Sequence, residues 1–328
     1  MILALKEERI TLSGAVSIGA TVTYTDKNTL SPVIVVIMGT GKTDRDGNEK
    51  GFRTDLYKKF AEFFTGLGFV CVRYDKRGTF QSTGNFNTAG LHDLTDDAIS
   101  VIRYVKALTY VDETKVLVCG HSEGAMIATL LSEKEDTAGL LLFGGAATSM
   151  RDALFYQNDL AAEEFQHKKG LLGMLLRSQT SKEKTNAKVD AMFQKCINTE
   201  KDRVFFGGAM LNAKWVREHA SYSSEDYITL LKKYGKPILA VTGTADISTD
   251  YRRLSALRDI PSAEIFTPSN VNHILREIDD DNSIMTVKKQ YGRLAVQPMH
   301  TATEEKVKEW LSQFQTMGNG VCQNETNN

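Results

Sequence analysis

The stretch Val116-Leu117-Val118-Cys119-Gly120-His121-Ser122-Glu123-Gly124-Ala125-Met126 decides the fold. An apolar run typical of a β-strand ends at Gly120, and apolar residues at helical spacing begin after Ser122. Gly-x-Ser-x-Gly in this context predicts a sharp strand-to-helix turn with the serine at its apex. Gly120 and Gly124 are expected because side chains at both positions would collide. A helix N-cap serine between turn glycines is the alternative, which the flanking strand and helix disfavour.

The composition of the chain limits the class of protein to which it can belong. The chain has 328 residues, of which 41% are hydrophobic and 25% charged, as in soluble globular proteins. A net charge of −1 gives no reason to expect nucleic acid or an anionic membrane as a partner. The N-terminal apolar run is too short for a signal peptide, and no stretch approaches a membrane span. The 4 scattered cysteines predict free thiols and a cytoplasmic location.

Strand-like and helical patterns alternate along the chain, which predicts an α/β protein with a mainly parallel sheet. Residues 7–12 and 15–24 predict a hairpin. Further strands are expected at 33–38, 69–74, 115–119, 139–143, 237–242 and 263–266, and helices at 53–66, 92–108, 123–133, 249–258 and 303–316. In such sheets, functional groups gather at the carboxyl ends of the strands.

The alternation stops between residues 150 and 235, where the spacing of apolar residues predicts helices only. This segment is too long for a loop, so we expect a helical lid inserted into a core formed by residues 1–149 and 236–317. Residues 318–328 are expected to be a disordered tail.

A nucleophilic serine needs a base and a group that orients the base. Of the 6 histidines, only His273 lies in a loop just after a late predicted strand. Asp246 follows the strand 237–242 and precedes His273, which gives the chain order Ser, Asp, His of a nucleophile-elbow enzyme. Asp250 is the second candidate for the acid. A surface loop histidine and an N-cap aspartate are the structural alternatives.

The oxyanion formed in acyl transfer requires preorganised donors. We expect the backbone N–H of Glu123, directly after the nucleophile, and that of Thr40 in the loop after the strand 33–38, with Gly41 as the next candidate. The neighbouring loop 44–48 is similar to a calcium loop, but its glycine is misplaced and no closing glutamate follows. We therefore expect no metal and no cofactor.

Four segments together resemble the α/β-hydrolase family: residues 39–48, 74–78, 120–124 and 272–273. The resemblance spans about residues 5–316 and is closest to lidded bacterial carboxylesterases related to dienelactone hydrolases and prolyl-oligopeptidase-like catalytic domains. It implies an eight-stranded sheet with an antiparallel second strand, a lid after the sixth strand, and a triad of Ser122, Asp246 and His273. Lys42 and Phe80 depart from the family pattern, which often has proline and glycine there.

These features predict a serine esterase that works through an acyl-enzyme on a small-molecule ester or related acyl substrate. A thioesterase or acyltransferase with the same triad is the alternative; a small-peptide serine peptidase and a non-catalytic receptor are less favoured. The oligomeric state is open, with a homodimer as one option. Candidate pocket residues are Phe80, His121, Phe155, Met174, Phe205 and Trp215.

Overall fold

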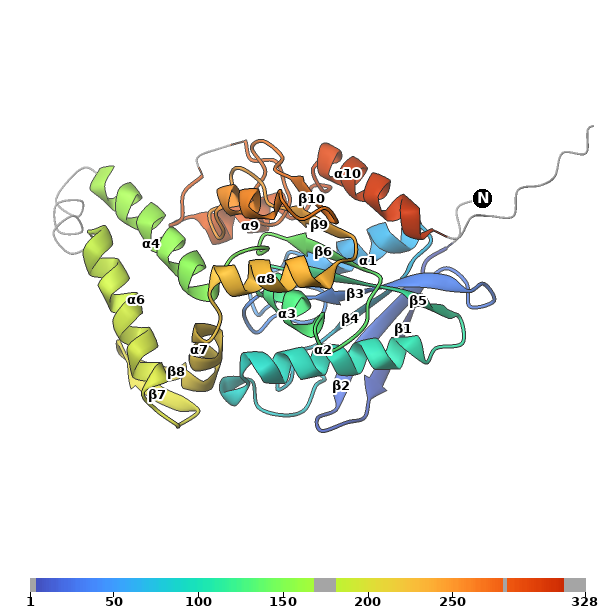
Figure 1. Cartoon of the computed structure of the whole chain (residues 1–328), viewed down its shortest axis with the longest axis horizontal. Coiled ribbons are helices and arrows are strands. Elements are labelled where there is room, and N and C mark those ends of the chain that lie inside the picture. Colours follow the sequence, from blue (N-terminus) through green and yellow to red (C-terminus); the bar gives the residue numbers. More distant parts are fainter. Residues whose placement is uncertain (1–3, 168–180, 280–281, 316–328) are drawn as a thin grey trace, which may run out of the picture.

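Eight strands form one sheet in the computed structural model, which describes residues 4–167, 181–279 and 282–315 (Figure 1). Their order is β1-β2-β4-β3-β5-β6-β9-β10. Strand β2 runs antiparallel to both of its neighbours and all other pairs are parallel, which confirms the predicted topology. The strands are β1 Lys6–Leu12, β2 Ile18–Tyr24, β3 Ser31–Ile37, β4 Val70–Tyr74, β5 Val111–His121, β6 Gly139–Phe143, β9 Ile238–Val241 and β10 Ala263–Phe266.

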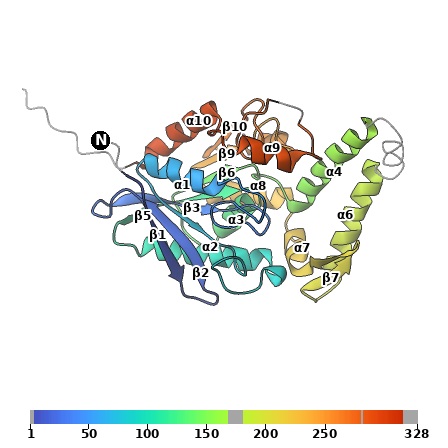
Figure 2. The ribbon, with the colours of Figure 1, turned by 180° about the vertical axis from the view of Figure 1, so that it is seen from behind.

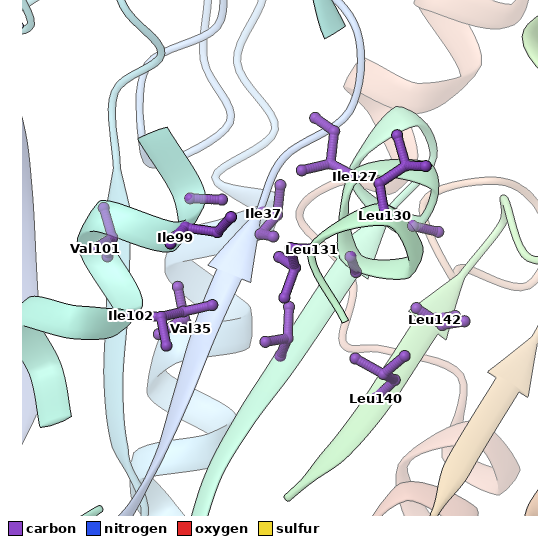
Figure 3. Packing of buried hydrophobic residues seen from close by; sticks show 14 of the residues in the cluster. Val35, Ile37, Ile99, Val101, Ile102, Ile127, Leu130, Leu131, Leu140 and Leu142 are labelled. Atoms are coloured by element: carbon purple, nitrogen blue, oxygen red, sulfur yellow. The ribbon is translucent and has the colours of Figure 1, made fainter. Parts of the chain in front are cut away.

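Helices cover both faces of the sheet. Helix α1 (Leu56–Gly66) and helix α10 (Thr301–Leu311) pack on one face, and α2 (Leu91–Lys106), α3 (Glu123–Leu131) and α8 (Ser224–Tyr234) pack on the other (Figures 1 and 2). Figure 3 shows aliphatic side chains of β3, β6, α2 and α3 converging in one layer. The central strands are buried on both faces, as their continuous apolar runs predict.

Two elements differ from expectation near the C-terminus. The predicted helix 249–258 is a 3₁₀ helix, η2 (Tyr251–Leu257). A further helix, α9 (Val287–Leu294), lies between the predicted strand 263–266 and the predicted helix 303–316, where no element was predicted. Helix α9 buries only Gln290 and Leu294, so its sequence carries little apolar periodicity from which to predict it.

The inserted segment contains α4 (Met150–His167), α6 (Lys182–Ile197), a β7–β8 hairpin (Arg203–Phe206 and Ala209–Asn212) and α7 (Ala213–Ala220). These elements lie together at one end of the molecule (Figures 1 and 2). The expectation of helices only was therefore wrong. Gly207 and Gly208, both at positive φ, form the turn of the hairpin, and a Gly-Gly pair between apolar residues was the overlooked signal.

The boundary of the insertion also differs from expectation. Tyr227 and Leu231 of α8 are buried in the same core cluster as α2 and α3. The insertion has its own small cluster, formed by Phe193, Cys196, Ala213 and Val216. Helix α8 therefore belongs to the core layer, and the separately packed part ends at α7. The expected tail, 318–328, lies outside the described residues.

Two further properties follow from the described ranges. Cys71, Cys119 and Cys196 are buried free thiols, as expected. None of the helices described there combines the length and apolarity that a bilayer span requires.

The turn between β5 and α3 has the predicted strained geometry. Ser122 adopts φ 56° and ψ −122°, and its backbone N–H donates to the carbonyl of Phe143 on β6 at 2.8 Å. A Cβ at Gly120 would lie 2.3 Å from the carbonyl oxygen of Gly124, and a Cβ at Gly124 would lie 2.1 Å from that of Ile37. Both glycines are therefore required for α3 to start this close to β3 and β5.

We predict that Gly124→Ala lowers the free energy of unfolding by about 3 kcal/mol, because the new methyl group overlaps backbone that cannot move away easily. Gly66→Ala in α1 is the matched control: its added Cβ has open space, so stability should change by less than about 1 kcal/mol. Urea denaturation of both variants measures the difference, and equal stabilities would contradict the tight-turn account.

Candidate active site

Asp246 and His273 meet at the carboxyl ends of β9 and β10. His273 Nδ1 lies 2.7 Å from Asp246 Oδ2. The Asp246 carboxylate is 1% exposed and also accepts the backbone N–H groups of Ser248 and Thr249 and the Thr249 hydroxyl, at 2.7 to 3.0 Å. These bonds fix the carboxylate, which holds the Nδ1–H of His273 and leaves Nε2 as the nitrogen that can accept a proton.

The loop that carries His273 is held by hydrogen bonds from two buried side chains, those of Asn272 and Arg276. The side-chain oxygen of Asn272 accepts the backbone N–H groups of Ile274 and Arg276, at 3.2 and 3.0 Å. The buried Arg276 guanidinium donates to the carbonyls of Ile274 and Gln297, each at 2.9 Å. Burial lowers the pKa of Arg276 to about 10. The histidine is therefore presented by a loop with its backbone groups satisfied.

Ser122 and His273 line the same cavity, which has a volume of about 340 Å³. The Ser122 hydroxyl makes no hydrogen bond to any described residue. Catalytic contacts of this kind are often long without substrate and tighten in the complex. Gly144, directly after β6, allows the His273 ring to lie against the end of this strand, since a Cβ at Gly144 would lie 2.9 Å from His273 Nδ1. The structure thus brings together the three residues predicted as a triad.

The loop after β3 supplies a further part of the cavity wall. Gly39 and Thr40 line it together with Glu123, the first residue of α3, whose N–H has no partner within the helix. The Gly39 N–H is already donated to the Tyr57 hydroxyl at 2.8 Å. This leaves the N–H groups of Thr40 and Glu123 as candidate oxyanion donors. Gly41 borders a smaller adjacent cavity instead.

A chain of hydrogen bonds, each with a defined donor, joins the loop after β3 to the loop that carries His273. His121 Nε2 lies 2.9 Å from the carbonyl oxygen of His273, which can only accept, so Nε2 carries the hydrogen. His121 Nδ1 then accepts from the Tyr57 hydroxyl at 3.1 Å. Burial, reinforced by the nearby His273, lowers the pKa of His121 to about 3, so the ring is neutral at pH 7. His121 lines the cavity, but both its nitrogens are engaged.

The side chain of Glu123 points into a buried polar cluster. Its Oε2 accepts from Lys76 Nζ at 2.9 Å, and Lys76 also donates to the Gly39 carbonyl at 2.6 Å. Its Oε1 accepts from Trp215 Nε1 at 2.5 Å and lies 3.2 Å from His219 Nε2, both on α7. Burial would raise the pKa of the Glu123 carboxyl, but Lys76 and His219 outweigh it and hold that pKa below its ordinary value.

The remaining candidate pocket residues are placed differently. Trp215 lines the cavity. Phe155 packs under the Arg151 guanidinium and is not part of the lining, while Phe80 and Phe205 are each 60% exposed and also lie outside it. Met174 lies outside the described residues. The aromatic character of these residues therefore did not show from the sequence which of them line the cavity and which lie on the surface.

Several residues at the site were not predicted from the sequence. Tyr57, Lys76 and His219, with the carboxylate of Glu123, connect the oxyanion loop, the elbow and α7. Lys76 lies in the segment 74–78, which was part of the family resemblance but carried no role for the lysine. Its position directly after the buried strand β4 was the one available signal. The contacts of Tyr57 and His219 depend on tertiary packing.

We predict that stability falls as the pH is lowered from about 6.5 towards 3, with His121 as one contributor. Its folded-state pKa lies below the ordinary 6.5, so the unfolded chain binds this proton first and acid favours unfolding. The contribution of one such group is at most about 1.4 kcal/mol per pH unit. In His121→Gln the decline should be shallower, as measured by urea denaturation at several pH values. Identical slopes would show that His121 is not a buried neutral group.

We predict that Glu123→Gln lowers the free energy of unfolding by about 3 kcal/mol, because it leaves the Lys76 ammonium, 3% exposed, without its counter-charge. Glu133→Gln is the matched control, since it removes an exposed pair with Lys233 and should cost less than about 1 kcal/mol. Denaturation at pH 7 measures both. A loss no larger for Glu123→Gln than for the control would contradict the buried-pair account.

Comparison with known proteins gives the family and the fold of the chain. The family model described as serine aminopeptidase, S33 (Hydrolase_4) matches residues 51–265. Esterase EstD of Thermotoga maritima is 24% identical over 123 residues, which are 38% of this chain and 29% of EstD, so the chain matches under a third of that relative's length.

Solved structures share the fold. Est1E from Butyrivibrio proteoclasticus with ferulic acid bound has a TM-score of 0.55 at 18% identity, covering 88% of this chain and 98% of its own. The alpha/beta hydrolase GrgF from Penicillium sp. sh18 has a TM-score of 0.59 at 13% identity, covering 96% and 100%. The chain has the α/β-hydrolase fold and belongs to the Hydrolase_4 family, described as serine aminopeptidase, S33.

Proposed function

We propose that the protein is a serine hydrolase that cleaves carboxylic esters. The observation that carries this proposal is the bonded His273–Asp246 pair on the same cavity as Ser122, which projects from a strained turn. A similar esterase, EstD, adds support from sequence. The predicted roles of the three residues are nucleophile for Ser122, general base and acid for His273, and orienting group for Asp246.

In the proposed reaction, His273 Nε2 takes the Ser122 proton while the hydroxyl oxygen attacks the ester carbonyl. The tetrahedral oxyanion accepts hydrogen bonds from the N–H groups of Thr40 and Glu123. His273 then gives its proton to the leaving alkoxide, and an acyl-enzyme remains on Ser122. Water, deprotonated by the same nitrogen, attacks the acyl-enzyme. The bond between the acyl carbon and the Ser122 oxygen then breaks, His273 returns the proton to that oxygen, and the carboxylic acid leaves.

The family description names a serine aminopeptidase, and the lining of the cavity supports the ester over the peptide as substrate. An unpaired acidic group would favour recognition of a peptide N-terminus, because the ammonium carries a positive charge. Among the residues described as lining the cavity, Glu123 is the sole acid, and its carboxylate is already paired with Lys76. A neutral ester therefore suits the cavity better. A thioesterase or acyltransferase with the same triad remains the alternative.

The partner that we propose is a small-molecule ester. The predicted cytoplasmic location rests on the buried free thiols of Cys71, Cys119 and Cys196, which suit a reducing compartment. The homodimer stays a prediction.

We predict that Ser122→Ala lowers kcat/KM for a small aryl ester by at least about a thousandfold, because removal of the nucleophile ends the acyl-enzyme route. Ser132→Ala, at the other end of α3, is the matched control and should keep the parent rate. Thermal denaturation checks that both variants fold. Near-parent hydrolysis by Ser122→Ala would contradict the proposal. Comparison of ester, thioester and alcohol acceptors separates hydrolase from transferase.

A further inference from the structure

A second cavity, of about 180 Å³, adjoins the main one. Its apolar walls are Phe86, Ala89, Leu94 and Trp215, and Thr40 and Gly41 of the oxyanion loop border it. The charged and amide side chains in its lining, Lys76, Glu123 and Asn212, are already hydrogen-bonded to protein groups. Trp215, Thr40 and Glu123 line both cavities. We therefore call the indole of Trp215 the partition between the two cavities. Thr40 and Glu123, the residues that carry the candidate oxyanion donors, border both spaces as well.

The partition is held from two sides. Trp215 Nε1 donates to the buried Glu123 carboxylate at 2.5 Å, and Lys76 fixes that carboxylate in turn. The Asn212 side chain, at the start of α7, donates to the carbonyls of Ala89 and Phe86 at 2.8 and 3.3 Å. Helix α7 is thus fastened to the opposite wall of the smaller cavity, so the space is preformed.

The volume limits what the smaller cavity can hold. A cavity of about 150 Å³ lined by Leu, Ile and Phe accommodates benzene in another protein. The smaller cavity therefore fits one compact apolar group of ring size, and the main cavity of about 340 Å³ fits a larger one.

The chemistry decides which half of an ester enters which space. The leaving oxygen must come within hydrogen-bond reach of His273, because this residue protonates it. His273 lines the main cavity and is not among the described residues that line the smaller one. The alcohol half therefore lies in the main cavity. The acyl group, on the other side of the carbonyl carbon, points away from His273.

We propose that the smaller cavity is the acyl site and that Trp215 is the wall that determines its specificity; this proposal rests on the proposed esterase function. The preferred substrates are then esters of short or ring-sized apolar acids, such as butanoic, hexanoic or benzoic acid. The alcohol half is less restricted in size. Decanoyl esters exceed the cavity and are poor substrates of the parent protein.

Two alanine-to-leucine variants test the assignment as a matched pair. Ala89 lines the smaller cavity and Ala153 lines the main one, and both are 4% exposed. The substrates are p-nitrophenyl esters with acyl groups from acetyl to decanoyl, and acetate esters of phenol, naphthol and larger alcohols. For Ala89→Leu, the hexanoyl-to-acetyl ratio of kcat/KM should fall about tenfold or more relative to the parent, with little change across the alcohol series. For Ala153→Leu, kcat/KM should fall for the larger alcohols, with little change in the hexanoyl-to-acetyl ratio.

Trp215→Ala should raise the decanoyl-to-hexanoyl ratio about tenfold, because it removes the partition. Should Ala89→Leu fail to fold, Leu94→Phe narrows the same cavity and gives the same test. The assignment is overturned when Ala89→Leu changes kcat/KM across the alcohol series instead of the acyl series. It is also overturned when the hexanoyl-to-acetyl ratio of Ala89→Leu and the decanoyl-to-hexanoyl ratio of Trp215→Ala both stay at parent values. A parent that hydrolyses no ester and reacts with no fluorophosphonate contradicts the proposed function itself, which distinguishes the two failures.

Discussion

Ser122 is held at φ 56° and ψ −122° between a strand and a helix so close that neither Gly120 nor Gly124 has space for a Cβ. A non-glycine residue in this conformation costs about 1–3 kcal/mol, so the surrounding structure must over-determine it. The buried second half of β5, from Val116 to His121, and the wholly buried helix α3 provide that support, since both pack into the core. The rest of the site depends on this constraint, because it places a hydroxyl, a free N–H and a helix N-terminus at one edge of the sheet.

The same turn also connects the core to the inserted segment. Glu123 has its backbone N–H at the cavity and its carboxylate in the cluster with Lys76, Trp215 and His219. A buried carboxylate with one cation and two further neighbours is costly to disrupt, so α7 is fixed relative to the nucleophile. The chain from Gly39 through Tyr57 and His121 to the His273 carbonyl fixes the other side. The cavity walls are therefore positioned by the groups that surround the serine.

Local patterns in the sequence were sufficient to predict the fold and to choose the residues of the candidate triad, whose roles stay a proposal. The elbow has a fixed chemistry, and Asp246 and His273 follow strands whose carboxyl ends must meet at one edge. The β7–β8 hairpin was missed because its strands are short and half-exposed, although Gly207 and Gly208 marked its turn. The cluster around Glu123 and the partition at Trp215 join segments far apart in the chain, and no local spacing encodes such contacts. Phe80, by contrast, was expected at the pocket and lies exposed.

The central claim is that the turn delivers Ser122 to the base His273. Covalent labelling tests it most directly: the protein is treated with a fluorophosphonate, digested, and the adduct located by tandem mass spectrometry. The account predicts one adduct, on Ser122, in the parent protein, and a labelling rate at least about a hundredfold lower in His273→Ala. An adduct on a different residue, or equally fast labelling without the imidazole, would contradict it.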